Sequence, residues 1–235
     1  MDIEEYSKIK HFYTGVIPEL LARYLDKNTW KSFLDVGCGD GSLLYALNKK
    51  GYFNDKNVYA IDLSKNRIDL CKKINQNFRC FVNSAGDMKA INDDSINFLV
   101  STQVIEHVQS DDELIKELAR VLEKNNNIVY LSTVFKKWYG WYFYRCNKKW
   151  TLDPTHLREY TKDNQLLDIF KKYDFEIIEC KKSLLWFTIS YFFMRRMHYK
   201  SNRINNPFLK FISLFKVPII GYYNWEIICS KNLKC

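Results

Sequence analysis

The stretch Phe33-Leu34-Asp35-Val36-Gly37-Cys38-Gly39-Asp40-Gly41-Ser42 decides the fold of this 235-residue chain. An apolar run leads into a glycine-rich turn, and Leu43, Leu44 and Leu47 then follow with helical spacing. Glycines permit a tight turn and let a ligand approach the backbone closely. The N-terminus of the following helix offers unpaired N–H groups to that ligand. The pattern predicts a first parallel strand that ends in a ligand-binding loop.

The acid that follows the second apolar run indicates a nucleoside ligand. Residues 58–61 are Val-Tyr-Ala-Ile, and Asp62 comes 21 residues after Gly41, where a doubly wound sheet offers a carboxylate to ribose hydroxyls. A dinucleotide fingerprint, G-x-G-x-x-G, would require glycine in place of Ser42, and Asp35 would repel a pyrophosphate. S-adenosylmethionine carries an ammonium and a sulfonium and no phosphate, so it suits Asp35 better. A dehydrogenase and a purely structural turn remain the alternatives.

The string Asp35-x-Gly37-x-Gly39-x-Gly41 resembles the first motif of the S-adenosylmethionine-dependent methyltransferases with a Rossmann-like fold. The resemblance is specific over about residues 30–135. It implies that the carboxylate of Asp87 and the N–H of Met88 meet the adenine, and that Gln103 neighbours the methionyl part. The cofactor-binding residues implied in this way are Asp35, Gly37, Cys38, Gly39, Gly41, Asp62, Leu63, Asp87, Met88 and Gln103.

Two histidines are candidates for acid–base chemistry. The segment 102–108, Thr-Gln-Val-Ile-Glu-His-Val, resembles the fourth motif of the quinone-biosynthesis subgroup and places His107 between cofactor and acceptor, as a base or as a structural residue. Many members of the family carry a histidine in the loop after the fifth strand, and His156 matches it. We predict His156 as the first candidate for a base or a substrate hydrogen-bond partner, with a structural role as the alternative. Arg158 could hold an anionic substrate group.

Apolar runs alternate with helical patterns through the first 135 residues, which predicts an α/β fold with a parallel sheet. The resemblance implies a Rossmann-like, doubly wound sheet of seven strands, mostly parallel with an antiparallel last strand. Strands six and seven are expected at 175–179 and 223–229, with a helical insertion between them. We predict a single methyltransferase domain over 1–235, made of an N-terminal helical lid (1–29, with Tyr13 as a lid residue), a cofactor-binding half (30–134) and a substrate half (135–235) with a basic-aromatic insertion (183–222).

The positive charge of the chain is concentrated in the substrate half. Residues 1–134 hold 17 basic and 19 acidic residues, a net charge of −2, whereas residues 135–235 hold 19 and 8, a net charge of +11. No acid lies between Cys180 and Trp225, and aromatic and basic residues are interleaved over 135–150. Such a stretch predicts an anionic partner: a membrane surface, a nucleic acid or a phosphorylated substrate. The apolar spacing over 184–215 suggests either interfacial helices at an anionic leaflet or a cap over the substrate pocket. A basic excess that only aids solubility is the alternative.

Cysteine usage and the start of the chain predict the compartment. The seven cysteines form no C-x-x-C pair, which argues against a zinc site and suits a reducing compartment, and we predict no metal ligands. The start, Met1-Asp2-Ile3-Glu4-Glu5, lacks a basic and then apolar secretory pattern. We therefore expect a cytoplasmic protein, either free or peripheral on the inner face of the membrane.

The combined prediction is methyl transfer from S-adenosylmethionine to an oxygen of a small-molecule, glycan or lipid-linked acceptor, at or near a membrane surface. One alternative is methylation of tRNA, although Ser101-Thr102-Gln103-Val104 differs from the N-P-P-Y motif used on nucleobase amines. Another is a catalytically inactive cofactor-binding or membrane-attached module. The sequence does not identify the acceptor.

Overall fold

The computed structural model describes residues 16–142, 144–146, 149–188 and 214–231. A seven-stranded sheet has the strand order β3-β2-β1-β4-β5-β9-β8. Its strands are β1 (Ser32–Val36), β2 (Asn57–Asp62), β3 (Arg79–Val82), β4 (Phe98–Thr102), β5 (Ile128–Lys136), β8 (Phe175–Thr188) and β9 (Lys216–Lys231). The helices are α2 (Glu19–Lys27), α3 (Ser42–Lys49), α4 (Lys65–Lys72), α5 (Asp111–Val121) and α6 (Asn164–Lys172). Two short strands, β6 (Tyr144–Cys146) and β7 (Lys149–Thr151), form a separate hairpin that the sequence did not predict.

The predicted fold class is confirmed. β3, β2, β1, β4 and β5 pair in parallel, and β9 lies antiparallel between β5 and β8. The order reverses between β1 and β4, which is the switch point at which open α/β sheets bind ligands.

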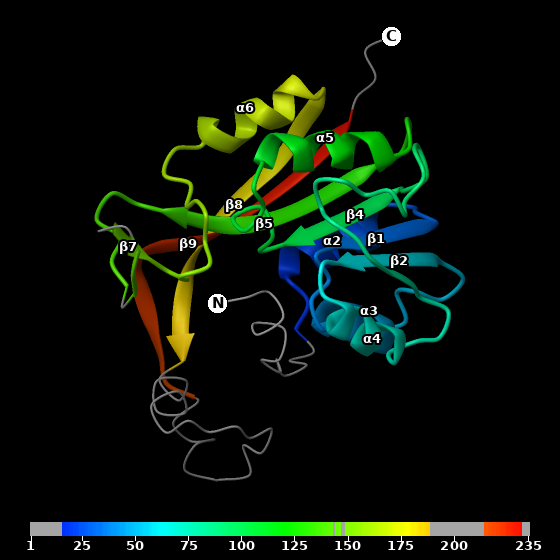
Figure 1. The fold of residues 1–235 in the computed structure, drawn as a ribbon, viewed down its shortest axis with the longest axis horizontal. Coiled ribbons are helices and arrows are strands. Elements are labelled where there is room, and N and C mark those ends of the chain that lie inside the picture. Colours follow the sequence, from blue (N-terminus) through cyan, green and yellow to red (C-terminus); the bar gives the residue numbers. More distant parts are fainter. Residues whose placement is uncertain (1–15, 143, 147–148, 189–213, 232–235) are drawn as a thin grey trace.

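Apolar residues on both faces of the sheet build a three-layer structure (Figure 1). Along β1, Phe33 packs into one buried cluster with α2, α3 and α4, whereas Leu34 and Val36 pack into another with α5 and α6. All five β1 residues are buried, as expected for a central parallel strand covered on both faces.

The sheet register brings the predicted cofactor loops to one edge. Val36, at the end of β1, lies opposite Ile61 of β2 and Ser101 of β4. The three strands end side by side, so their following loops meet. This is the geometry that the glycine turn and Asp62 required.

The predicted helical insertion at 183–222 is wrong at both of its described ends. Residues 183–188 belong to β8 and 216–222 to β9, while 189–213 lie outside the described residues. The run 184–194 is apolar at nearly every position, so its periodicity does not separate a helix from a strand. Backbone pairing decides that both described ends are strand. β9 pairs with β5 on one side and with β8 on the other, and the pairing with β8 extends through residues 183–188.

The predicted N-terminal lid is described only in part. α2 buries Leu20, Leu21 and Leu25 in the core, and Tyr24 donates to Glu179 of β8 at 3.0 Å. Tyr13 lies outside the described residues. Within the described chain, no helix is long and apolar enough to cross a membrane.

Candidate active site

The glycine loop follows β1 directly and adopts a conformation that glycine permits. Gly37, Gly39 and Gly41 have φ angles of 71°, 56° and 83°. The N–H groups of Gly37 and Cys38 donate to the carbonyl of Ile61 at 2.8 and 3.0 Å, which ties the loop to the end of β2. A Cβ atom at Gly37 would lie 2.4 Å from a methyl of Val104, whereas one at Gly39 would meet no atom within 4 Å. The loop therefore packs tightly at Gly37 and is open at Gly39.

Two carboxylates lie beneath and beside this loop. Asp35 is 1% exposed, and no polar atom among the described residues hydrogen-bonds to its Oδ1. Burial, and then the neighbouring Asp62, raise the pKa of Asp35 to about 7. Asp62 is held rigidly, since it accepts from the N–H of Gly39 at 3.0 Å and from that of Ser64 at 2.8 Å. Leu63 follows with its side chain half exposed.

These features fit S-adenosylmethionine. The unpartnered Oδ1 of Asp35 suits a cationic group, because an ammonium nearby would offset the cost of burying the carboxylate. Gly39 leaves room at the loop surface, and Asp62 is fixed at the end of the neighbouring strand. Asp35, the three glycines and Asp62 are thus the residues that would hold the cofactor.

The other predicted cofactor residues already have partners within the protein. Asp87 is exposed and pairs with Lys89 at 2.7 Å. The N–H of Met88 already donates to Glu117 at 2.6 Å, so this amide is engaged within the protein. Gln103 has a φ of 54° and donates to Asn224 of β9 at 3.1 Å. Contacts of Asp87, Met88 and Gln103 with the cofactor stay predictions.

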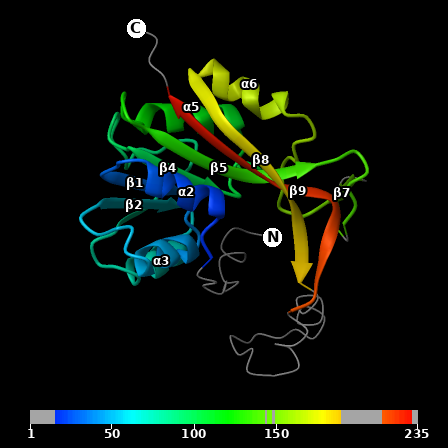
Figure 2. The same ribbon diagram turned by 180° about the vertical axis from the view of Figure 1, so that it is seen from behind.

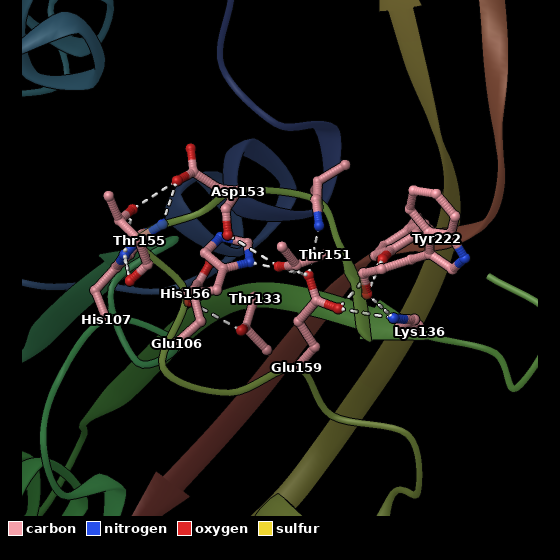
Figure 3. A network of polar contacts seen from close by, with 12 residues as sticks. Glu106, His107, Thr133, Lys136, Thr151, Asp153, Thr155, His156, Glu159 and Tyr222 are labelled. Atoms are coloured by element: carbon pink, nitrogen blue, oxygen red, sulfur yellow. Dashed lines mark hydrogen bonds and ion pairs between the residues drawn. The ribbon is translucent and has the colours of Figure 1, made fainter. Parts of the chain in front are cut away.

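A second polar cluster joins both candidate histidines (Figure 3). Glu106 and His107 come from the loop after β4, and His156 comes from the loop after β7. The two loops are tied together, because the N–H of Leu157 donates to the carbonyl of Glu106 at 2.9 Å. The rings of His107 and His156 lie 4.9 Å apart, edge to face. The structure thus brings together two residues that are 49 positions apart in the sequence.

Glu106 is fully buried at the base of this cluster. Its Oε2 accepts from the hydroxyl of Thr133 at 2.9 Å, while its Oε1 has no hydrogen-bond partner among the described residues. Burial raises the pKa of this carboxyl. Ligand atoms of Glu106, His107 and His156 all lie within 4.8 Å of one another, so these three side chains could hold a divalent metal ion.

Glu159 fixes the orientation of His156. Its Oε1 lies 3.2 Å from Nδ1 of the imidazole, and its Oε2 accepts from the Tyr222 hydroxyl at 3.2 Å and lies 3.3 Å from Nζ of Lys136. Burial alone would raise its pKa, but hydrogen bonds from His156, the Leu152 N–H and Thr151 outweigh burial and lower the pKa to about 2. An ionised carboxylate only accepts hydrogen bonds, so Nδ1 of His156 carries the proton. In the neutral tautomer with that proton, Nε2 is the ring nitrogen that can accept a hydrogen bond.

His107 differs from His156 in its partner. Its Nδ1 lies 3.3 Å from the carbonyl and 3.2 Å from the hydroxyl of Thr155, and no carboxylate of the described residues hydrogen-bonds to it. Burial, and then His156, lower its pKa. The lowered pKa favours the neutral form of His107 beside His156.

Arg158 does not offer an anion site, which corrects the sequence expectation. Its guanidinium donates to the carbonyls of Ile105, Val108 and Gln109 at 2.9, 2.7 and 2.7 Å. Arg158 instead fixes the loop that carries Glu106 and His107.

Sequence reasoning missed Glu159, Lys136 and Tyr222. Glu159 stands three residues after His156, a spacing that could have suggested the pair. Tyr222 and Lys136 carried no such signal, because only the pairing of β5 with β9 places them side by side.

Comparisons with known proteins agree with the fold and with the cofactor loop. A family model described as "Methyltransferase domain" matches residues 9–180. Ubiquinone biosynthesis O-methyltransferase of Pelagibacter ubique is 27% identical over 173 residues, which is 70% of each chain. The matches to the enzymes of that name in Saccharomyces cerevisiae and Coxiella burnetii span 40% and 44% of their lengths.

Solved structures share the fold at low identity. An S-adenosylmethionine-dependent methyltransferase of Methanosarcina mazei has a TM-score of 0.61 at 19% identity, covering 93% of this chain and 99% of its own. Phosphoethanolamine N-methyltransferase 2 of Haemonchus contortus, solved with S-adenosyl-L-methionine, has a TM-score of 0.58 at 16% identity, covering 88% of this chain and 50% of its own.

Proposed function

Because the chain belongs to the S-adenosylmethionine-dependent methyltransferase family, we propose that it methylates a hydroxyl oxygen, with His156 as the general base. The acceptor is a small molecule or a lipid-linked compound. The similarity to a ubiquinone biosynthesis O-methyltransferase supports an oxygen acceptor.

The observation that carries the proposal is the His156–Glu159 pair beside the cofactor loop. Val104 packs on Gly37, and Glu106, two residues later, binds the His156 loop through its carbonyl. The histidine cluster is therefore close to the glycine loop. A buried carboxylate that orients an imidazole supports a base rather than a packing residue.

A hydroxyl acceptor needs a group that removes its proton. When bound, S-adenosylmethionine supplies an electrophilic methyl group on its sulfonium. A phenol or alcohol must lose its proton to become an effective nucleophile, and in this proposal Nε2 of His156 accepts that proton while Nδ1 is held by Glu159. The Glu159 carboxylate then stabilises the imidazolium. Alignment of acceptor and methyl group supplies much of the remaining rate.

The direct test is transfer of radioactive methyl groups from labelled S-adenosylmethionine to separated cell fractions. The proposal predicts label in the small-molecule or lipid fraction, and a loss of roughly 100-fold or more with His156→Asn. Label in the RNA fraction alone would identify a tRNA methyltransferase instead. Folded protein that binds the cofactor but labels no fraction would support an inactive module. Full activity in the His156→Asn protein would refute the assignment of the base.

A further inference from the structure

The strands β8 and β9 project beyond the rest of the sheet as a two-stranded ribbon (Figures 1 and 2). β5 pairs with β9 only as far as Lys136 opposite Tyr222. Beyond that point Trp186 pairs with Pro218, and Phe187 pairs with Val217. The ribbon thus carries its side chains away from the helices that cover the sheet.

Large apolar side chains are exposed at this projecting end. Trp186 of β8 is 55% exposed and Ile220 of β9 is 61% exposed. The segment 137–141 lies along β9, because Lys137 donates to the Gly221 carbonyl at 2.8 Å and Trp141 donates to that of Ile220 at 3.2 Å. This segment adds Trp138, which is 91% exposed. An exposed apolar surface of this kind in a folded protein marks an interaction site.

Two facing glycines, Gly140 and Gly221, let the segment 137–141 approach β9 closely. Gly221 has a φ of 73°, and a Cβ atom there would lie 2.5 Å from Cα of Gly140. A Cβ at Gly140 would lie 2.9 to 3.1 Å from atoms of Lys136, Lys137 and Gly221. Facing glycines allow this approach, so the fold specifies that the segment 137–141 runs beside β9.

The segments that carry these side chains contain basic residues and no acid. Residues 135–151 contain five basic residues and no acid, and no acid lies between Cys180 and Trp225. Lys137 and Lys216, both exposed, flank the apolar side chains. We call Trp138, Trp141, Trp186 and Ile220, with Lys137 and Lys216, the ribbon patch. A surface of tryptophan and lysine without acids is complementary to an anionic, half-apolar partner.

We propose that the ribbon patch docks the protein on the surface of an anionic lipid bilayer. Tryptophan favours the headgroup region, where its ring is partly buried and its N–H is hydrated. Each lysine near an anionic leaflet adds roughly a fivefold gain in binding. The patch also adjoins the candidate active site, since Tyr222, two residues along β9 from Ile220, donates to Glu159. Docking would bring that site close to a lipid-linked acceptor.

Vesicle co-sedimentation of the full chain tests this without any methyl acceptor. The probes are phosphatidylcholine vesicles with and without phosphatidylglycerol, at low and high salt. The proposal predicts binding to anionic vesicles that weakens with salt, because the lysines are exposed. Equal binding to both vesicle types, or binding to neither, would overturn it. Binding to tRNA without binding to vesicles would overturn it in favour of a nucleic-acid surface.

Variants locate the surface. Trp138→Ser/Trp186→Ser/Ile220→Ser is expected to weaken vesicle binding roughly tenfold or more, because it removes the apolar anchors. Lys137→Gln/Lys216→Gln should lose about fivefold for each lysine and much of the salt dependence. Tyr45→Ser/Ile178→Ser, which changes exposed apolar residues elsewhere, is the matched control.

Thermal unfolding and calorimetry with S-adenosylmethionine confirm that each variant is folded. Unchanged vesicle binding in the triple variant, or equal loss in the control, would refute the ribbon patch. Neither result depends on methyl transfer, so the proposed function and the docking surface succeed or fail separately.

Discussion

Replacing Glu159 with Gln tests how the candidate base is held. The carboxylate lies 3.2 Å from Nδ1 of His156 and is largely buried, with 10% of its side chain exposed. A hydrogen bond to a charged group contributes about 1.5–3 kcal/mol. Loss of this hydrogen bond in the transition state corresponds to a decrease of roughly 10- to 150-fold in kcat/KM. Glutamine keeps the shape but carries no charge to stabilise the imidazolium.

The assay combines kinetics with nitrogen-15 spectra of the histidines. In the wild-type protein Nδ1 of His156 should carry the proton, and the Glu159→Gln protein should show a mixture of tautomers because the amide can donate as well as accept. The chain has only four histidines, which makes assignment practical. Glu179→Gln, at an exposed carboxylate that contacts α2, is the control. Wild-type kcat/KM and an unchanged tautomer in a folded Glu159→Gln protein would refute the reasoning.

Three further predictions concern the loops. Gly37→Ala should destabilise the fold by more than the roughly 1–2 kcal/mol that a positive φ costs a residue with a side chain, because the new Cβ would meet Val104, and adding Val104→Ala should restore part of the melting temperature. Gly39→Ala should stay folded yet bind S-adenosylmethionine more weakly in calorimetry. Equal melting temperatures of the Gly37→Ala and Gly39→Ala proteins would contradict this prediction. The carboxyl of Asp35 ionises near pH 3.8 when unfolded and near pH 7 when folded, so the stability of the cofactor-free protein falls as the pH rises between these values. Asp35→Asn should therefore be more stable than wild type at pH 8, by on the order of a few kcal/mol in denaturant unfolding, while binding the cofactor more weakly. Lower stability than wild type at pH 8 would contradict the inference that the buried carboxylate destabilises the cofactor-free protein. Arg158→Ala should lower kcat with little change in cofactor affinity, because it frees three carbonyls of the loop that carries His107, and unchanged kcat would show that the loop holds without it.

The sequence predicts the cofactor half well because its signals are local. The glycine string, Asp62 and the alternation of apolar runs each depend on a few neighbouring residues, and the parallel sheet that they predict is present. The start of α4 is equally local, since the hydroxyl of Ser64 accepts from the N–H of Arg67 and caps the helix.

The substrate half is harder to predict because it depends on distant pairing. Nothing near Tyr222 indicates that it will reach Glu159, since that contact requires β9 to pair with β5. The ends of the insertion were predicted as helix and are strand for the same reason. Arg158 looked like an anion ligand until the fold placed three backbone carbonyls around it.

The most direct test of methyl transfer to oxygen is a carbon-13 spectrum of the reaction products. The protein is incubated with S-adenosylmethionine carrying a carbon-13 methyl group and with a cell extract of lipids and small molecules. The account predicts a new signal with the chemical shift of a methyl ether, absent when His156→Asn replaces the wild type. A signal from a methyl group on nitrogen or carbon, or no transfer by folded, cofactor-binding protein, would contradict it.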